Sequence, residues 1–276
     1  WFLVSNWGET PRGLPDGRDP EQILTDLGDG YGLAQVYDVA HRSAEIDGDH
    51  LRAAEAAHRA LQVCLDYELW AEATYWYAAT AVAALRSGDV ARATREVARA
   101  RSLAHDVAGG EHSSQYVDFV DAMIARYDGD LLRARASLER LLATGGLEAS
   151  RDPAAHLESG FLAVQQHDLD RAEEAYRAVH RLLARRAGVP AIARGLELAA
   201  AIRALRGQVD VAAELLGTAE AHRDRSNLPA PTLVRRDLDR VRNVIDEHLP
   251  GEQAAAAFNR GWSRDPGTQF QAVAPD

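Results

Sequence analysis

Residues that could carry chemistry are present in this chain, but their spacing matches no catalytic or metal-binding pattern. The ten histidines are scattered, no two of them are four residues apart, and no HExxH motif occurs. A zinc site needs three or four ligands. With Cys64 as the one cysteine, those ligands would have to be histidines and carboxylates far apart in the sequence. We therefore expect no metal site in this chain.

The candidate nucleophiles are also better explained without catalysis. Ser113 and Ser114 stand beside His112, but no G-x-S-x-G motif accompanies them. We expect them in the loop after Gly109–Gly110, where serine is ordinary turn or cap material. Cys64 lies on a predicted helix, and a small buried apolar residue explains it better than a reactive thiol does.

The basic residues exclude several further kinds of chemistry. All 31 of them are arginine, and the chain contains no lysine. A phosphate-binding P-loop and a Schiff-base enzyme each require a lysine, so this chain provides neither. Its carboxylates are numerous but form no recognisable pair. We expect no enzymatic activity and no cofactor.

Charge and composition narrow the partners and the compartment. The net charge of −11 disfavours nucleic-acid binding by this segment itself. A single cysteine cannot form a disulfide within the chain, which is typical of a reducing cytoplasm. The longest apolar stretch, residues 75–85, is too short to span a bilayer. The chain begins with Trp1 rather than Met, so we expect a fragment or a processed product.

A short pattern recurs along the chain at a nearly fixed interval. It consists of a Gly-Asp pair with an alanine five residues after the glycine, and its steps are 40, 41, 38 and 40 residues. The copies are Gly48-Asp49 with Ala53, Gly88-Asp89 with Ala93, Gly129-Asp130 with Ala134, and the weaker His167-Asp168 with Ala172 and Gly207-Gln208 with Ala212. Such a period is typical of a helical-repeat solenoid.

Each repeat can be interpreted as helix, tight turn and helix. The glycine ends the first helix in a left-handed conformation, and the aspartate caps the second helix. The alanine lets the two helices approach closely. The sequence therefore predicts an all-α fold, a right-handed superhelical solenoid of tetratricopeptide-like helix pairs with about 40 residues per unit. We expect an irregular segment at 1–30, five repeats at 31–222, capping helices at 223–262 and a tail at 263–276.

The last hundred residues carry the most specific signal. Residues 212–223 (AAELLGTAEAHR) precede a proline-containing loop at 227–231 and an arginine-rich helix, and residues 249–258 and 261–262 follow. This part closely resembles the C-terminal end of the tetratricopeptide-like arm of actinobacterial transcriptional regulators. These are the large ATP-dependent LuxR- and MalT-like proteins and the antibiotic regulators with a SARP-type DNA-binding head. The resemblance extends over 31–262 and departs at 263–276.

The tetratricopeptide resemblance also implies a ligand groove. In such repeats the groove residues lie about 13, 10, 6 and 3 positions before the turn glycine. Carried onto this chain, the candidates are Tyr75, Val82, Tyr116, Phe119, Met123, Arg126, Leu157, Phe161 and Arg194. The same register includes Ala78, Leu85, Ala154, Val164, Glu197, Ala201 and Ala204, and in the first copy the polar residues Gln35, Asp38, Arg42 and Glu45. Two interpretations stay open. Either these residues line a hydrophobic groove, or they are packed between helices, because the units are longer than 34 residues.

The resemblance implies a function without catalysis. In such regulators the repeat arm receives an inducer or partner and controls self-association, while DNA-binding and NTPase parts lie elsewhere. The expected function is a ligand- or protein-binding regulatory repeat domain of a bacterial transcriptional regulator, and the alternative is a free-standing scaffold or peptide-binding adaptor. The expected partner is a protein or peptide, with a small apolar effector as a second kind of ligand. Homodimerisation stays open.

Overall fold

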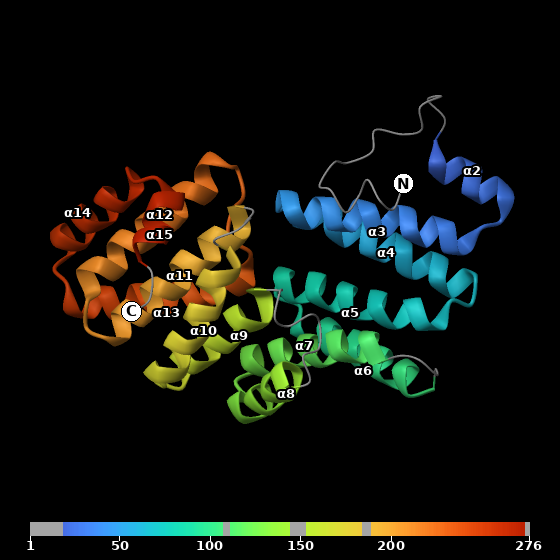
Figure 1. Ribbon diagram of the computed structural model, residues 1–276, viewed down its shortest axis with the longest axis horizontal. Coiled ribbons are helices and arrows are strands. Elements are labelled where there is room, and N and C mark those ends of the chain that lie inside the picture. The colour runs from blue at the N-terminus through green and yellow to red at the C-terminus, as the bar shows by residue number, and fades with distance from the viewer. Residues whose placement is uncertain (1–18, 107–110, 144–152, 184–188, 274–276) are drawn as a thin grey trace. The chain divides into compact units, whose positions relative to one another are not determined.

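The computed structural model describes residues 19–106, 111–143, 153–183 and 189–273. Within these ranges it contains fourteen helices and no strand, so the fold is all-α (Figure 1). The chain divides into two compact units, residues 1–85 with 89–120 and residues 86–88 with 121–276. No helix in the described ranges combines the length and the apolar character needed to cross a membrane.

The first unit contains six helices, the last of which continues into the second unit. They are α2 (Pro20–Leu27), α3 (Gly30–Asp47), α4 (His50–Asp66), α5 (Trp70–Ser87), α6 (Val90–Asp106) and α7 (Glu111–Asp128). The core of this unit includes small residues of α4 and α5 and the ring of Trp76, which is 4% exposed. Because so many of these residues are alanines, the helices can pack at short distances.

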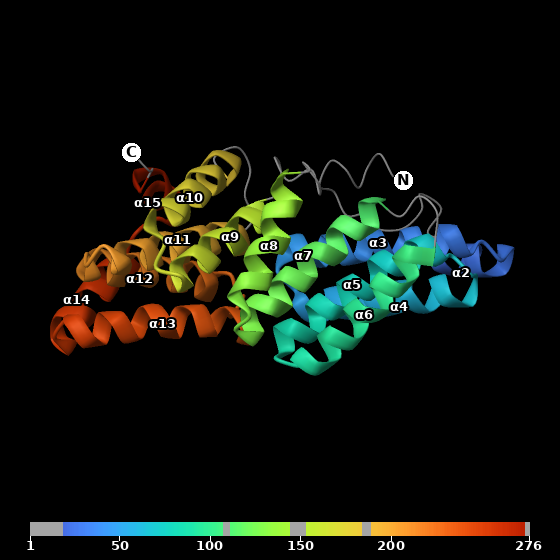
Figure 2. The ribbon, with the colours of Figure 1, turned by 90° about the horizontal axis from the view of Figure 1, so that it is seen from below.

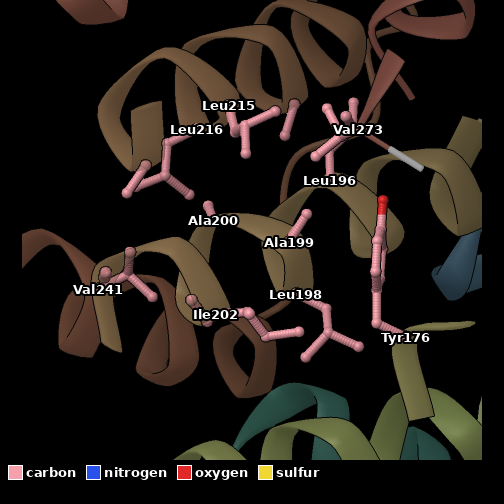
Figure 3. Close-up of a cluster of buried hydrophobic side chains, with 14 of the residues drawn as sticks. Tyr176, Leu196, Leu198, Ala199, Ala200, Ile202, Leu215, Leu216, Val241 and Val273 are labelled. Atoms are coloured by element: carbon pink, nitrogen blue, oxygen red, sulfur yellow. The ribbon is translucent and has the colours of Figure 1, made fainter. Parts of the chain in front are cut away.

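The second unit contains eight further helices and includes the last turns of α7. They are α8 (Leu131–Ala143), α9 (Pro153–Gln165), α10 (Leu169–Leu183), α11 (Val189–Leu205), α12 (Val209–Arg225), α13 (Thr232–His248), α14 (Gly251–Trp262) and α15 (Pro266–Ala272). Side chains of α10, α11, α12 and α13 form a continuous apolar core, and Val273 adds to it after α15 (Figure 3). Helix α11 lies inside this core, since ten of its residues are buried.

The turns predicted from the repeat have the expected backbone. Gly48, Gly88, Gly129 and Gly207 have φ values between +72° and +90°, and His167 has φ +55°. The aspartate after four of these turns caps the next helix. For example, Asp49 accepts from the Arg52 amide at 3.1 Å, and the equivalents are Asp89, Asp130 and Asp168. Gln208, which lacks the carboxylate, forms no such cap with any described residue.

The repeated alanines are buried, as the close approach of helices requires. Ala53, Ala93, Ala134, Ala172 and Ala212 are each at most 1% exposed. The small residues seven positions before the turns are buried as well. These are Ala81, Ala122, Gly160 and Ala200. In the first copy of the repeat this position is His41, whose ring lies edge-on to Trp76.

Three local expectations differ from the structure. The described part of the segment 1–30 contains α2, which begins with the capping residue Asp19 and with Pro20 in the first turn. The segment 263–276 contains α15, which is capped by Asp265 and anchored by Phe270, 2% exposed. Residues 113 and 114 lie within α7 rather than in a loop. In the first two cases an Asp-Pro pair starts the helix, because proline suits the first helical position.

The segment expected to cap the repeats, 223–262, packs against the rest of the second unit through two helices, α13 and α14. Helix α14 packs closely on α12, and Gly217 and Gly261 stand at the crossing. A Cβ on Gly217 would collide with the Phe258 carbonyl, and a Cβ on Gly261 would collide with the Glu214 carbonyl. Helix α13 lies along α11 and α12 (Figure 2). Its residue Asp237 is 3% exposed and lies in the interior of the second unit.

Candidate functional site

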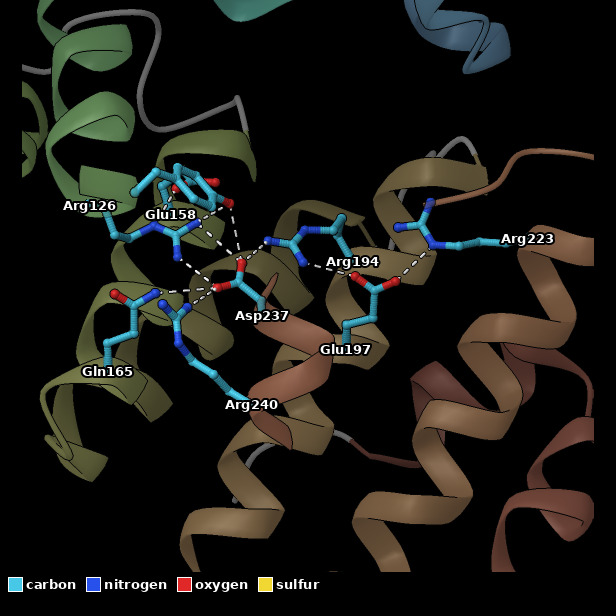
Figure 4. Close-up of polar contacts among 9 residues, drawn as sticks. Arg126, Glu158, Gln165, Arg194, Glu197, Arg223, Asp237 and Arg240 are labelled. Carbon is cyan, nitrogen blue, oxygen red and sulfur yellow. Dashed lines mark hydrogen bonds and ion pairs between the residues drawn. The ribbon is translucent and has the colours of Figure 1, made fainter. Parts of the chain in front are cut away.

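A cluster of buried charges lies in the second unit, and Asp237 of α13 is at its centre (Figure 4). Arg126 Nη1, from α7, donates to Asp237 Oδ1 at 2.9 Å. Arg126 Nε donates to Glu158 Oε2 of α9 at 2.7 Å. Both carboxylates are nearly inaccessible, and the Arg126 side chain is 0% exposed. The guanidinium of Arg126 is therefore held by two carboxylates from two other helices.

The cluster continues through α11 to α12. Arg194 Nη2 donates to Asp237 Oδ2 at 3.0 Å, and its Nη1 donates to Glu197 Oε2 at 2.9 Å. The other oxygen of Glu197 accepts from Arg223 Nε at 2.8 Å. Arg194 also lies over the ring of Phe161, with Cζ 3.8 Å from the ring centroid. A continuous chain of charged hydrogen bonds thus joins α7, α9, α11, α12 and α13.

The buried charges of this network balance. It contains three guanidiniums and three carboxylates, from Arg126, Arg194, Arg223, Glu158, Glu197 and Asp237. Burial alone would raise the pKa of Asp237, but Arg126 and Arg194 hold that pKa well below its usual range. Burial likewise works against the charged form of Arg126, yet the two carboxylates keep its pKa well above the ordinary value. Asp237 and Arg126 are therefore expected to be charged at neutral pH.

Two polar groups extend the network toward solvent. Arg240 lies one turn after Asp237 on α13, and its Nη1 donates to Asp237 Oδ1 at 3.1 Å. Its side chain is 51% exposed, so it is the accessible cation beside a buried and balanced set. In the amide orientation that satisfies both of its ends, Gln165 of α9 accepts from Arg240 Nη1 at 2.8 Å and from Arg126 Nη1 at 2.7 Å. Asp237 itself receives hydrogen bonds from α7, α11 and its own helix.

A cavity of about 490 Å³ opens beside this network and is called the groove cavity below. Its polar wall includes Arg126, Asp237 and Arg240. Its apolar wall is formed by side chains of α9, α11 and α13, together with Leu131 of α8. These apolar residues are Leu131, Phe161, Val164, Ala201, Ala204, Leu205, Val241 and Val244. The groove cavity is therefore mostly apolar, with charged groups along one wall.

The groove register and the groove cavity share five residues. Arg126, Phe161, Val164, Ala201 and Ala204 all belong to the register and line the groove cavity. The other candidates of the second unit, Met123 and Leu157, are 8% exposed, and Phe161 is 2% exposed. Arg194 joins the ion network behind the cavity. Most of these side chains are packed between helices, which was the second interpretation of the register.

In the first unit, three aromatic candidates form one stack. The rings of Tyr75 and Tyr116 are 4.9 Å apart and nearly parallel, and Phe119 stacks on Tyr116 at 6.4 Å. Phe119 is 7% exposed and Val82 is 8% exposed, whereas the two tyrosines are partly exposed.

The sequence did not reveal the residue that organises the site. Asp237 lies in a helix expected only to cap the repeats, among several arginines, and it belongs to none of the repeated motifs. Glu158 and Arg223 were missed for the same reason. One signal was available: α13 has an apolar stripe of Leu233, Val241 and Ile245, and Asp237 falls on that stripe. A carboxylate on a buried face needs a partner.

Other reactive groups suggest no chemistry. Burial raises the pKa of the Cys64 thiol to about 12, so the thiol form dominates at neutral pH. Among the described residues, no three His, Cys, Asp or Glu side chains are grouped closely enough to hold a metal ion.

Comparison of the chain with protein-family models, curated proteins and solved structures gave no match. The function is therefore argued from the groove cavity and its charges.

Proposed function

We propose that this chain is the ligand-binding regulatory repeat domain of a bacterial cytoplasmic transcriptional regulator, without catalytic activity of its own. In this proposal the helix pairs form a right-handed solenoid with about 40 residues per unit. The groove cavity receives a small apolar effector. The observation that carries the proposal is that residues of the predicted groove register and of α13 together enclose one mostly apolar cavity. The transcriptional role rests on the resemblance of residues 212–262.

The size and walls of the groove cavity support a small ligand. Small-molecule sites usually have volumes of about 300–1,000 Å³ and are mostly apolar with a few polar groups. The groove cavity has about 490 Å³. Arg240 supplies a donor at its polar wall. The Arg240 side chain is 51% exposed, and the hydrogen bond to Asp237 uses Nη1 of its guanidinium. An effector with an apolar body and one acceptor group fits these walls.

The position of α13 favours a small effector over a peptide helix. Asp237 of α13 binds Arg126 and Arg194, which are two of the groove candidates. Val241 and Val244 of the same helix line the groove cavity. Helix α13 thus already contacts the residues that a peptide helix would use in this unit. A peptide could enter only by displacing α13 and depriving two buried arginines of their shared carboxylate, which is costly.

The proposal can be tested by thermal-shift screening against small apolar metabolites and against peptides. The decisive variant is Val164→Trp, which fills the groove cavity without altering a charge, because Val164 is a partly buried residue of its wall. The matched control is Val211→Trp, since Val211 is 38% exposed on α12 and does not line the cavity. We expect apolar hits that stabilise the wild type and the control but not Val164→Trp.

Arg240 provides a second, independent pair of variants. Arg240→Gln should weaken hits that carry an acceptor group and leave purely apolar hits unchanged. Arg99→Gln is its control, because Arg99 is also an exposed arginine paired with a carboxylate three residues away. Hits that bind Val164→Trp as well as the wild type would contradict the proposal. A screen in which only peptides bind would favour the alternative of an adaptor.

Exposed apolar side chains support the alternative of an adaptor, and they also support self-association. In the first unit, Leu27, Tyr31, Ile46 and Leu51 are between 55% and 85% exposed. Exposed apolar residues in such numbers are common where a protein binds another chain or a second copy of itself. Light scattering over a range of concentrations tests self-association, and Leu51→Glu should lower the fraction of dimer. A monomer at all concentrations would contradict the homodimer.

A further inference from the structure

A second cavity, separate from the groove cavity, lies between α12 and α13. It has a volume of about 380 Å³ and is called the Arg223 cavity below. Its apolar walls come from α12, the loop at 226–231, α13 and the last residue of α14. They include Leu216, Ala219, Leu228, Leu238 and Trp262. None of the described residues lines both cavities.

Arg223 is the feature that distinguishes this cavity from an ordinary surface recess. The residue is 5% exposed and lines the cavity. One nitrogen of its guanidinium already has an acceptor, because Nε donates to Glu197 at 2.8 Å. Its Nη2 is buried and has no hydrogen-bond partner among the described residues. An arginine is always charged, and a buried N–H group without an acceptor costs stability, so this nitrogen requires an acceptor.

The other charged groups of the cavity show which acceptor fits. Arg242 is already paired with Glu220 at 2.7 Å. Arg235 donates through Nε to the Ala230 carbonyl at 2.9 Å, and none of the described carboxylates forms an ion pair with it. Asp224 is an exposed carboxylate at the rim.

Glu197 accepts from Arg223 Nε and from Arg194 Nη1, but it forms no hydrogen bond with Arg223 Nη2. Two arginines of the cavity, Arg223 and Arg235, therefore have N–H groups that an added anion could engage. A carboxylate suits a guanidinium particularly well, because both groups are planar and can form charge-assisted hydrogen bonds.

We propose that the Arg223 cavity binds a small organic acid. The carboxylate of the acid accepts from Arg223 Nη2 and is also held by the guanidinium of Arg235. Its apolar body lies against Leu216, Leu228 and Trp262. The unpartnered N–H of Arg223 and the guanidinium of Arg235, which pairs with none of the described carboxylates, supply the affinity, and the apolar walls favour an acid with an apolar body. This site is independent of the proposed effector in the groove cavity.

The test uses two ligands of nearly equal shape and different charge, phenylacetate and phenylacetamide, measured by isothermal titration calorimetry. We expect phenylacetate to bind at least about tenfold more tightly, since a hydrogen bond to a charged group contributes more than a neutral one. Arg223→Met should abolish this preference. Arg235→Gln should weaken phenylacetate several-fold and keep the fold, because Arg235 is exposed. Arg236→Gln is the control, since Arg236 is its exposed neighbour and does not line the cavity.

The outcomes separate this proposal from the one on the groove cavity. Val164→Trp should leave phenylacetate binding unchanged, whereas binding lost in that variant would place the ligand in the groove cavity and overturn the inference. If Arg223→Met does not fold, the two ligands and Arg235→Gln still decide the question. Equal binding of phenylacetamide, or no phenylacetate binding at concentrations up to about 10 mM, would overturn it, because the Nη2 acceptor would then be water.

Discussion

Asp237 and Arg126 form a buried ion pair at 2.9 Å although 111 residues separate them in the sequence. The pair joins α13 to α7, and Arg194 adds α11 to the same carboxylate at 3.0 Å. Breaking a buried pair is costly, because the remaining partner stays buried without compensation. The position of α13, and with it one wall of each cavity, therefore depends strongly on one carboxylate.

The first prediction concerns the stability that Asp237 provides. Asp237→Ala should lower the free energy of unfolding by about 3–5 kcal/mol, because it leaves Arg126 and Arg194 without their shared carboxylate. Asp239→Ala is the control, since Asp239 lies on the same helix, is 64% exposed and pairs with Arg242. Urea unfolding followed by circular dichroism measures both. Equal losses in the two variants would show that the buried network does not stabilise the fold.

The second prediction is the pH dependence of the same pair. The arginines hold the pKa of Asp237 well below its usual range, whereas the unfolded value is about 3.9. A depressed pKa contributes stability that is present above the unfolded pKa and is lost as the pH falls toward the folded pKa. Wild type should therefore exceed Asp237→Asn in stability at pH 7, and the difference should shrink from about pH 4 downward. A difference that stays constant between pH 7 and pH 3 would contradict this.

The third prediction tests the crossing of α12 and α14. Gly261→Ala should destabilise by about 3 kcal/mol or more, at or above the upper end of overpacking costs, since the added methyl group meets the backbone of Glu214 and Thr218 rather than a movable side chain. Gly251→Ala is the control on the same helix, because a Cβ there meets no atom within 4 Å. Thermal unfolding monitored by calorimetry compares the two, and similar melting temperatures would refute the close crossing.

The fourth prediction concerns the repeated alanine. Ala134→Leu should cost about 1–3 kcal/mol through overpacking, since Ala134 is 0% exposed between helices. Ala93→Leu should behave alike for the same reason. Ala136→Leu, at an exposed position of α8, should change stability little. Unchanged thermal stability in both buried variants would show that these alanines do not mark close helix contacts.

The fifth prediction tests whether α15 belongs to the second unit. Phe270→Ala should cost about 3–5 kcal/mol, because the ring is 2% exposed and packs against Gly195 and on the ring of His180. Gln271→Ala, on the exposed side of the same short helix, should have a small effect. Chemical denaturation of the two variants decides this. An equally small effect of Phe270→Ala would make α15 an appendage without a structural role.

Local features of the fold could be predicted because their causes are local. A left-handed glycine, the aspartate cap after it and the buried alanine all act within six residues, and the structure confirms them at Gly48, Gly88 and Gly129. The helix starts at Asp19 and Asp265 carried the same kind of signal. They were overlooked because α2 and α15 have eight and seven residues, too few to show a helical period.

The candidate site could be predicted only in part. The groove register placed Arg126, Phe161 and Val164 near one another, because residues at equivalent positions of stacked helices lie on the same face. It could not supply Asp237, since that residue enters from a helix outside the repeats. The network from Arg126 to Arg223 requires five helices to meet, and the sequence separations of its hydrogen bonds range from 3 to 111 residues.

The sequence by itself therefore determined the helices, the geometry of the repeated turns and the residues that must be small. These depend on backbone conformation and on spacing along one helix, which neighbouring residues decide. Only the tertiary structure decided that α13 lies against the groove register, that Asp237 neutralises two buried arginines, and that Arg223 keeps an unpartnered nitrogen at a second cavity. Burial and charge pairing arise from residues that meet only after folding, so no local pattern encodes them.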